Sequence, residues 1–234
     1  MNLRKLILTE NECYKAGKKI KPSGIMLHST AANNPRLSRY VGPDDGKLGV
    51  NKYNNHWNQY RPGGRQVCVH AFIGKLADGS IATYQTLPWD HLGWHAGGTA
   101  NNTHIGFEIC EDDTNDADYF GKVYKEAVEL CAYLCKQYGL TERDIICHSE
   151  GYKLGIASNH SDVMHWFPKH GKTMDDFRED VKKLLNVPKE EVWYQLQVTT
   201  TVPGHMYKSK SEAEKKRLEI RACGFNASVV EVKR

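Results

Sequence analysis

Short apolar runs alternate with polar segments along the first four fifths of the chain, and their periods predict strands and helices. Each predicted strand is apolar for a few residues and is bounded by polar or turn-forming residues. A further strand at 80–87 follows Asp78-Gly79, a dipeptide typical of hairpin turns. The other predicted strands are 24–30 (GIMLHST), 67–74 (VCVHAFIG), 104–110 (HIGFEIC) and 144–148 (DIICH).

Two longer stretches carry apolar residues at helical spacing. Between Tyr119 and Tyr138 the apolar side chains recur along one helix face, and Gly139 is a typical helix stop. Residues 173–185 begin with a threonine cap and an acidic first turn and end in lysines, which suits the helix dipole. Strands interleaved with helices predict an α/β fold, in which a mixed central β-sheet is flanked by α-helices.

The last part of the chain has a different organisation. Residues 187–192 are polar and contain a proline, so we expect them to link a domain at 1–186 to a small unit at 193–234. The pattern of that unit predicts a strand, a helix at 211–223 and a second strand, a small βαβ unit. A unit of about forty residues buries too little apolar surface to be stable alone. We therefore expect it to dock or to self-associate into a homo-oligomer.

Composition and charge narrow the class of protein. The chain has 234 residues, of which 40% are hydrophobic and 26% charged, ordinary values for a globular domain with a small appendage. No apolar run approaches the ~20 residues of a membrane helix. The net charge is only +4, and its basic bias lies in 189–234, where nine Lys and Arg face six Asp and Glu. Such a small charge excess does not form the basic surface of a nucleic-acid-binding protein. We therefore expect neither a membrane nor a nucleic-acid partner.

The N-terminus and the cysteines bear on the compartment. The first residues turn polar after a very short apolar patch and lack an Ala-x-Ala-like cleavage site, so no signal peptide is predicted. We expect the protein to stay in the cytoplasm until it is released. Seven cysteines form an odd set without a CxxC pair, which predicts mostly free thiols and no cysteine-rich zinc finger. Cys131 and Cys135, spaced along a helical pattern, are expected to be reduced and buried.

Histidines at strand ends indicate a hydrolytic metal site. His28 lies near the end of one predicted strand and His148 ends another. Each alone is better explained as a buried histidine bonded to backbone, but two of them in one fold favour a shared metal. A catalytic zinc ion takes three protein ligands and keeps one position open. The residues leave the third ligand open between His160, Asp162 and His165.

Glu108 lies in the middle of an apolar strand. A carboxylate there must be paired, bound to a metal or held with a raised pKa, and the last state is what a general base needs. A salt-bridged structural glutamate explains the residue equally well. The nearby loop 94–98 (WHAGG) combines an aromatic ring, an imidazole and flexible glycines. Such a loop can line a groove for a sugar or peptide, or it can be a tight turn under a core tryptophan.

Several ordered motifs resemble those of zinc-dependent N-acetylmuramoyl-L-alanine amidases, a family shared by phage endolysins, bacterial autolysins and animal peptidoglycan-recognition proteins. The motifs are LHST, VHAFIG with its DG turn, LPWDHLGWHAGG, NTHIGFEIC, and His148 with Asp162, all within residues 20–185. They are most similar to endolysins and prophage amidases of Gram-positive hosts. The resemblance implies a mixed sheet flanked by helices, with one zinc ion in a groove.

The resemblance also implies an activity. A member of this family hydrolyses the amide between N-acetylmuramic acid and L-alanine in bacterial peptidoglycan, which leads to lysis of the cell wall. By motif, the zinc ligands are His28, His148 and Asp162, and Glu108 is the catalytic glutamate. His160 stands where the family commonly has a lysine that stabilises the oxyanion, and an imidazole can donate the same hydrogen bond. The gap between His148 and Asp162 is longer here than the family pattern.

The resemblance also suggests substrate-binding residues and a role for the C-terminal unit. Trp94, His95, Gly97 and Asn102 are expected to shape the substrate groove. The C-terminal unit is similar to half of a SPOR-type peptidoglycan-binding domain, which makes it a candidate for wall binding or self-association. Two rival functions are a peptidoglycan-binding protein that does not cut and a zinc peptidase acting on the stem peptide. Three candidate ligands together with Glu108 favour an enzyme, because a pure binder needs none of them.

Overall fold

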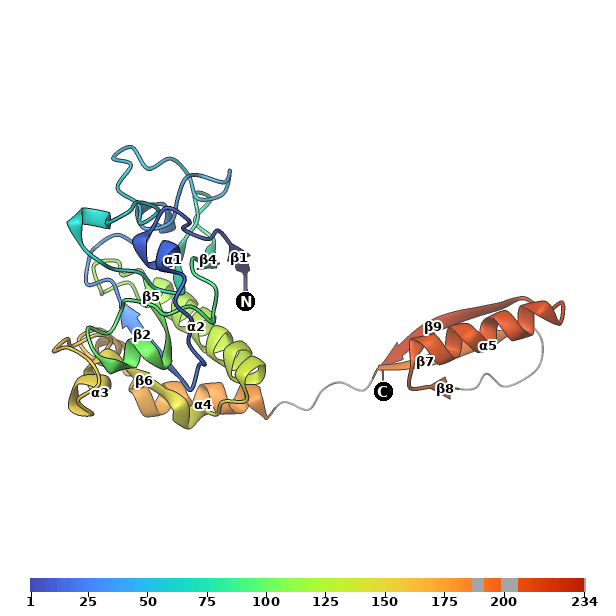
Figure 1. Ribbon diagram of the computed structural model, residues 1–234. Coiled ribbons are helices and arrows are strands. Elements are labelled where there is room, and N and C mark those ends of the chain that lie inside the picture. Colours follow the sequence, from blue (N-terminus) through green and yellow to red (C-terminus); the bar gives the residue numbers. More distant parts are fainter. Residues whose placement is uncertain (187–191, 199–205, 234) are drawn as a thin grey trace. The chain divides into compact units, whose positions relative to one another are not determined.

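The computed structural model describes residues 1–186, 192–198 and 206–233 (Figure 1). The chain divides into two compact units, Met1–Asn186 and Val187–Arg234. Apart from Val192, the predicted linker at 187–192 lies outside the described residues, and its role as a linker stays a prediction.

A six-stranded mixed β-sheet forms the centre of the first unit, with the strand order β1-β4-β3-β5-β2-β6. Within it, β3 and β4 pair antiparallel across the predicted hairpin turn, and every other neighbouring pair is parallel. The predicted mixed sheet is confirmed. The strands are β1 (Leu3–Lys5), β2 (Gly24–Ser29), β3 (Ala71–Lys75), β4 (Ile81–Gln85), β5 (His104–Ile109) and β6 (Ile145–Cys147).

The two long helices follow the sequence signals closely. In α2 (Ala117–Tyr138), Asp116 caps the first turn, and Gly139 ends the helix with a φ of 68°. In α4 (Met174–Leu185), Thr173 and Asp176 form a reciprocal capping box. The two helices pack against each other and cover one face of the sheet (Figure 1). The unit also contains two short α-helices, α1 (Glu12–Ala16) and α3 (His148–Lys153), and five short 3-10 helices.

The alternation of side chains along the strands gives the sheet two different faces. Ile25 and Leu27 of β2 and Phe107 of β5 are fully buried in the cluster that contains α2 and α4. His28 and Glu108 are the next residues along these strands, so they leave the sheet on the opposite face. The two pair directly across the parallel strands β2 and β5. The fold therefore places an imidazole and a carboxyl side by side.

The segment before β3 differs from the prediction. The predicted strand at 67–74 begins only at Ala71, because Cys68 instead forms an isolated antiparallel bridge with Trp94. Cys68 is also disulfide-bonded to Cys13 of α1. The expectation of free thiols is therefore wrong for these two cysteines, and the disulfide ties α1 to the segment that precedes β3.

The other cysteines that the structure describes follow the expectation. Cys131 and Cys135 of α2 are free and buried, as predicted, and so are Cys110 and Cys147. Cys223 is free and exposed.

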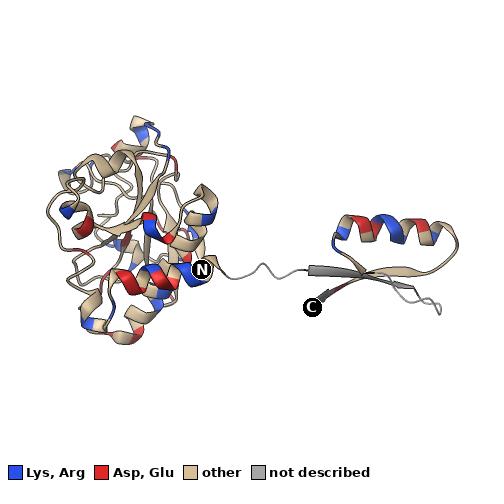
Figure 2. Cartoon of the chain, turned by 90° about the horizontal axis from the view of Figure 1, so that it is seen from below, with Lys and Arg blue, Asp and Glu red and all other residues tan. Residues whose placement is uncertain are grey.

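The second unit is a small antiparallel sheet with one helix. Its strands lie in the order β8-β7-β9, and β7 pairs antiparallel with both neighbours. The predicted strand, helix and strand are present, with β8 as an additional short strand. Acidic and basic residues are interspersed along α5 (Figure 2), where Lys216 pairs with Glu219 and Arg217 with Glu214. The elements are β7 (Val192–Val198), β8 (Met206–Tyr207), α5 (Lys210–Ala222) and β9 (Ala227–Lys233).

Among the described residues, no helix is both long and apolar enough to span a membrane.

Candidate metal centre

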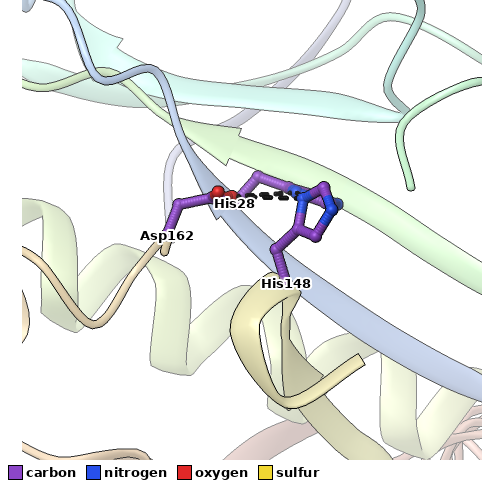
Figure 3. Close-up of side chains that lie close together, drawn as sticks. All are labelled: His28, His148 and Asp162. Carbon is purple, nitrogen blue, oxygen red and sulfur yellow. Dashed lines mark hydrogen bonds and ion pairs between the residues drawn. The ribbon is translucent and has the colours of Figure 1, made fainter. Parts of the chain in front are cut away.

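Three buried side chains from distant parts of the chain point toward one another (Figure 3). His28 comes from β2, His148 is the first residue of α3, and Asp162 lies in the segment after α3. The two Nδ1 atoms lie 3.0 Å apart, and Asp162 Oδ2 lies 3.1 Å from His28 Nδ1 and 3.5 Å from His148 Nδ1. The backbone N–H of Ser149 donates to the Asp162 carbonyl at 3.1 Å, which holds two of the three segments together.

The spacing of these donor atoms fits a tetrahedral zinc ion. Ligand atoms about 2.0–2.1 Å from such an ion lie about 3.3 Å from one another. The three distances observed, 3.0, 3.1 and 3.5 Å, bracket that value. Imidazole nitrogen and carboxylate oxygen are also ligands that zinc prefers. The residues present therefore fit a zinc ion with three protein ligands.

The protonation of His28 follows from its neighbours. His95 Nε2 lies 3.2 Å from the carbonyl oxygen of His104, which can only accept, so His95 carries its proton on Nε2. The Nδ1 of His95 then accepts a hydrogen bond from His28 Nε2 at 2.9 Å. Burial lowers the pKa of both imidazoles, so they are neutral. His28 therefore presents an unprotonated Nδ1 to the metal position.

His148 also has a hydrogen-bond partner on its outer nitrogen, Nε2. Ser158 Oγ donates to the carbonyl oxygen of Ala96 at 3.2 Å, and it accepts from His148 Nε2 at 3.2 Å. With a proton on Nε2, Nδ1 is the nitrogen of His148 that can bind a metal. Both histidines are thus oriented by partners on the nitrogen that faces away from the metal position.

Asp162 is ionised and Glu108 favours its neutral form. Burial opposes ionisation of Asp162, but its contacts with His148 and His28 outweigh burial and hold its pKa well below the ordinary range. These contacts favour the carboxylate when a proton or a bound cation lies between the facing atoms. Burial raises the pKa of Glu108, and the charges of Asp162 and Glu111 raise it further. Glu108 Oε2 is buried and has no hydrogen-bond partner among the described residues. Such a carboxyl can take a proton from a substrate or water molecule in the cavity.

The side chains of this site line one cavity of about 410 Å³. His28, His148 and Asp162 line it together with Glu108 and His160. The His160 ring stacks on the His148 ring, with the centroids 4.7 Å apart, and its Nδ1 lies 3.9 Å from Asp162 Oδ1. The side chain of His160 is 62% exposed, so it adjoins the metal group and remains accessible to a substrate.

The residues predicted to bind substrate lie in different surroundings. His95 lines the cavity, whereas Trp94, Gly97 and Asn102 do not contribute to its lining as the structure describes it. Trp94 packs against the disulfide-bonded cysteines. Gly97 has a φ of +62°, and a Cβ there would lie 2.7 Å from Ser158 Oγ. The substrate-binding role of these residues stays a prediction.

The structure also separates the alternatives for a third donor and shows residues that the sequence did not indicate. His165 Nε2 lies 2.9 Å from Glu111 Oε1, away from His28 and His148, whereas Asp162 lies with these two histidines.

Asn101 Oδ1 accepts from the backbone N–H groups of His95 and the next residue, at 3.0 and 2.8 Å, and so fixes the loop at 94–98. Asn101 and Ser158 escaped sequence analysis because their partners are backbone groups or lie far along the chain.

Comparison with known proteins places these features in a family. The family described as N-acetylmuramoyl-L-alanine amidase matches residues 18–168. A bifunctional autolysin of Staphylococcus epidermidis is 30% identical over 120 residues, which cover 51% of this chain and 7% of that protein. The N-acetylmuramoyl-L-alanine amidase CwlH of Bacillus subtilis is 38% identical over 71 residues, 29% of this chain and 27% of that protein. The chain therefore matches less than a third of the length of these curated relatives.

Solved structures show the same fold. The structure of PlyL matches with a TM-score of 0.55 at 18% sequence identity, over 80% of this chain and 99% of that chain. A likeness at this level of identity supports the architecture, a mixed sheet flanked by helices.

Proposed function

The chain belongs to the N-acetylmuramoyl-L-alanine amidase family, and we propose that it is a zinc hydrolase that cleaves the amide between N-acetylmuramic acid and L-alanine in bacterial peptidoglycan. The observation that carries this proposal is the convergence of His28, His148 and Asp162 in one cavity with the buried carboxyl of Glu108. A protein that only binds peptidoglycan needs neither three converging donors nor an adjacent carboxyl with a raised pKa.

Each side chain has a defined task in this proposal. His28, His148 and Asp162 would hold the zinc ion, which lowers the pKa of a water molecule and polarises the amide carbonyl. Glu108 takes the proton of the attacking water and delivers it to the leaving amine of L-alanine. Its raised pKa suits both steps, because the carboxyl must accept a proton and release it again. His160 donates a hydrogen bond to the developing oxyanion.

The surroundings of the site have supporting tasks. His95 orients His28, and Ser158 orients His148, through the hydrogen bonds to the outer nitrogens. We further propose that Trp94, Gly97 and Asn102 shape the loop that borders the substrate groove, with Trp94 acting through its packing on the disulfide.

Peptidoglycan is the proposed partner and the cell wall the proposed place of action, as for an endolysin. We propose wall attachment as the role of residues 193–234. The described residues give no support for the predicted self-association of this unit. Retention of the protein in the cytoplasm until its release remains a prediction.

The deciding experiment is digestion of purified peptidoglycan by the full chain, with and without a chelator. We expect new free L-alanine amino groups, their loss on chelation and their return when zinc is added. New reducing sugar ends would instead indicate a glycosidase. New amino groups on residues other than L-alanine would indicate a peptidase that cuts within the stem peptide.

A further inference from the structure

The cavity that contains the metal group is also lined by two arginines, Arg39 and Arg65. Neither guanidinium has a carboxylate within the 4.0 Å of an ion pair among the described residues. Arg61, four residues before Arg65, is by contrast paired with Glu12. The cavity therefore carries two positive charges that the described part of the protein does not neutralise.

Arg39 is held in place by groups that leave most of its donors available. Its Nη1 donates to the carbonyl oxygen of Asn55 at 2.7 Å, and its guanidinium carbon lies 5.2 Å from the centroid of the Tyr40 ring. Tyr40 is itself packed between Trp57 and Phe72, with ring centroids 6.2 and 5.1 Å away. One of five N–H donors is used in the Asn55 bond. The guanidinium of this half-buried residue is thus preorganised to bind an anion.

Arg65 extends the same wall of the cavity. It follows a short 3-10 turn at Pro62–Gly64, and Trp57 and Val67 line the cavity beside it. Trp57 also donates its backbone N–H to the Tyr40 carbonyl at 2.8 Å, which connects this segment to the one that carries Arg39. The two arginines therefore line the same cavity from segments other than those that supply the metal group.

The chemistry of the substrate indicates what this wall binds. The amide that the proposed function cleaves separates N-acetylated sugars, which are uncharged, from a peptide that carries free carboxylates. Guanidinium groups recognise carboxylates through paired, charge-assisted hydrogen bonds. We propose that Arg39 and Arg65 form a carboxylate-binding subsite for the acidic stem peptide on the leaving-group side of the amide. This inference rests on the proposed function.

Phosphate groups of an anionic wall polymer offer guanidinium groups the same chemistry. The stem peptide is favoured because Arg39 and Arg65 line the very cavity in which the amide reacts. A carboxylate covalently joined to the reacting amide is brought into that cavity by the substrate itself.

The test compares two synthetic muramyl peptides that differ only in a free carboxylate or a carboxamide on the residue after L-alanine. The kcat/KM of each is measured for the zinc-loaded wild type, Arg39→Gln, Arg39→Lys and Arg65→Gln, and calorimetry gives the Kd of each released peptide. Wild type should prefer the carboxylate form. We expect that preference to fall about tenfold in Arg39→Gln and about threefold in Arg65→Gln, whose side chain is exposed. Arg39→Lys keeps the charge and should retain part of the preference.

Arg143→Gln is the matched control, because this side chain is 88% exposed and does not line the cavity. Its preference should equal that of wild type. Arg65→Gln removes no hydrogen bond that Arg39 depends on, so it tests the subsite even if Arg39→Gln fails to fold.

The outcomes separate the two proposals. Equal preference in wild type and in every arginine variant overturns the subsite while hydrolysis stands. If wild type cleaves neither peptide, the proposed function fails, and a Kd that depends on the carboxylate and on the arginines still supports the subsite. If inorganic phosphate inhibits wild type but not Arg39→Gln while the carboxylate preference is unchanged, the wall binds phosphate and the peptide assignment is overturned.

Discussion

Replacement of Glu108 by glutamine should separate proton transfer from metal binding and from folding. The side chain keeps its shape but can no longer accept the proton of the attacking water. General acid–base catalysis contributes about 10²–10⁴-fold to a rate, so kcat should fall by about that factor. Because Glu108 is outside the group of three converging donors, zinc affinity should stay close to the wild-type value.

The same substitution should alter the pH dependence of stability. Burial and the charges of Asp162 and Glu111 raise the pKa of Glu108, so the folded protein holds this proton more tightly than the unfolded chain does. A raised pKa stabilises the folded state below the ordinary carboxyl pKa, and that stabilisation is lost as the pH rises through the raised value. Glutamine has no such loss. The metal-free variant should therefore gain stability relative to wild type as the pH rises above the ordinary carboxyl pKa, when an acidic and an alkaline pH are compared.

Three measurements check the prediction: the rate of amide hydrolysis, zinc affinity by competition with a chromophoric chelator, and the Tm of metal-free protein at both pH values. Glu126→Gln is the matched control. Glu126 is also a buried carboxyl, but it accepts hydrogen bonds from Asn2 and Thr83 and does not line the cavity. The folded control should keep the wild-type kcat. Wild-type hydrolysis in Glu108→Gln would refute the role of Glu108 as the base.

Three further perturbations test the surroundings of the site. His95→Ala should weaken zinc binding by about 10–100-fold; an unchanged affinity in the chelator competition would show that the orienting hydrogen bond is dispensable. Gly97→Ala should destabilise the protein by about 1–3 kcal/mol, because the position has positive φ and a Cβ would meet Ser158, and a wild-type urea midpoint would contradict this. Replacing Cys13 and Cys68 by serine should cost about 4 kcal/mol for a separation of 55 residues, measured by denaturation under non-reducing conditions, and equal stability would rule out a structural disulfide.

Strong periodicity made part of the fold predictable. The helix at 117–138 has both an apolar face and a glycine stop, and the helix at 174–185 has a capping box, so local sequence and tertiary packing agree. The strand β1 and the helix α1 have three and five residues, too few to show a period. Asn11 caps α1 and Gly17 ends it, but without a visible period these two local signals do not by themselves predict a helix.

The start of the helix at His148 could not be predicted from the local sequence. The apolar run at 144–148 predicts a strand that includes His148, but the strand ends at Cys147. Glu150 Oε2 accepts the backbone N–H of Cys147 at 3.0 Å, and Arg178 holds this carboxylate in an ion pair. The cap begins α3 at His148. The partner from α4 that supports this cap is far along the chain and cannot be found by spacing.

The candidate site shows the same limit. The residue types and the family resemblance pointed to His28, Glu108 and Asp162, but no sequence pattern gives the register between β2 and β5 that places the first two side by side. Arg39 and Arg65 were missed for a related reason. They belong to segments without regular period, which contact each other through Tyr40 and Trp57 and line one cavity only in the folded chain.

The hydrogen bond from Ser149 to the Asp162 carbonyl has a consequence for protein engineering. It closes the segment between His148 and Asp162 at its base, so the distance between these two residues does not depend on how many residues the loop contains. This explains how a longer gap than the family pattern leaves the donors together. Leu154, the residue that follows α3 in that segment, is 64% exposed. New chain termini or a reporter peptide introduced at Leu154 should therefore leave His148 and Asp162 at the same distance from each other.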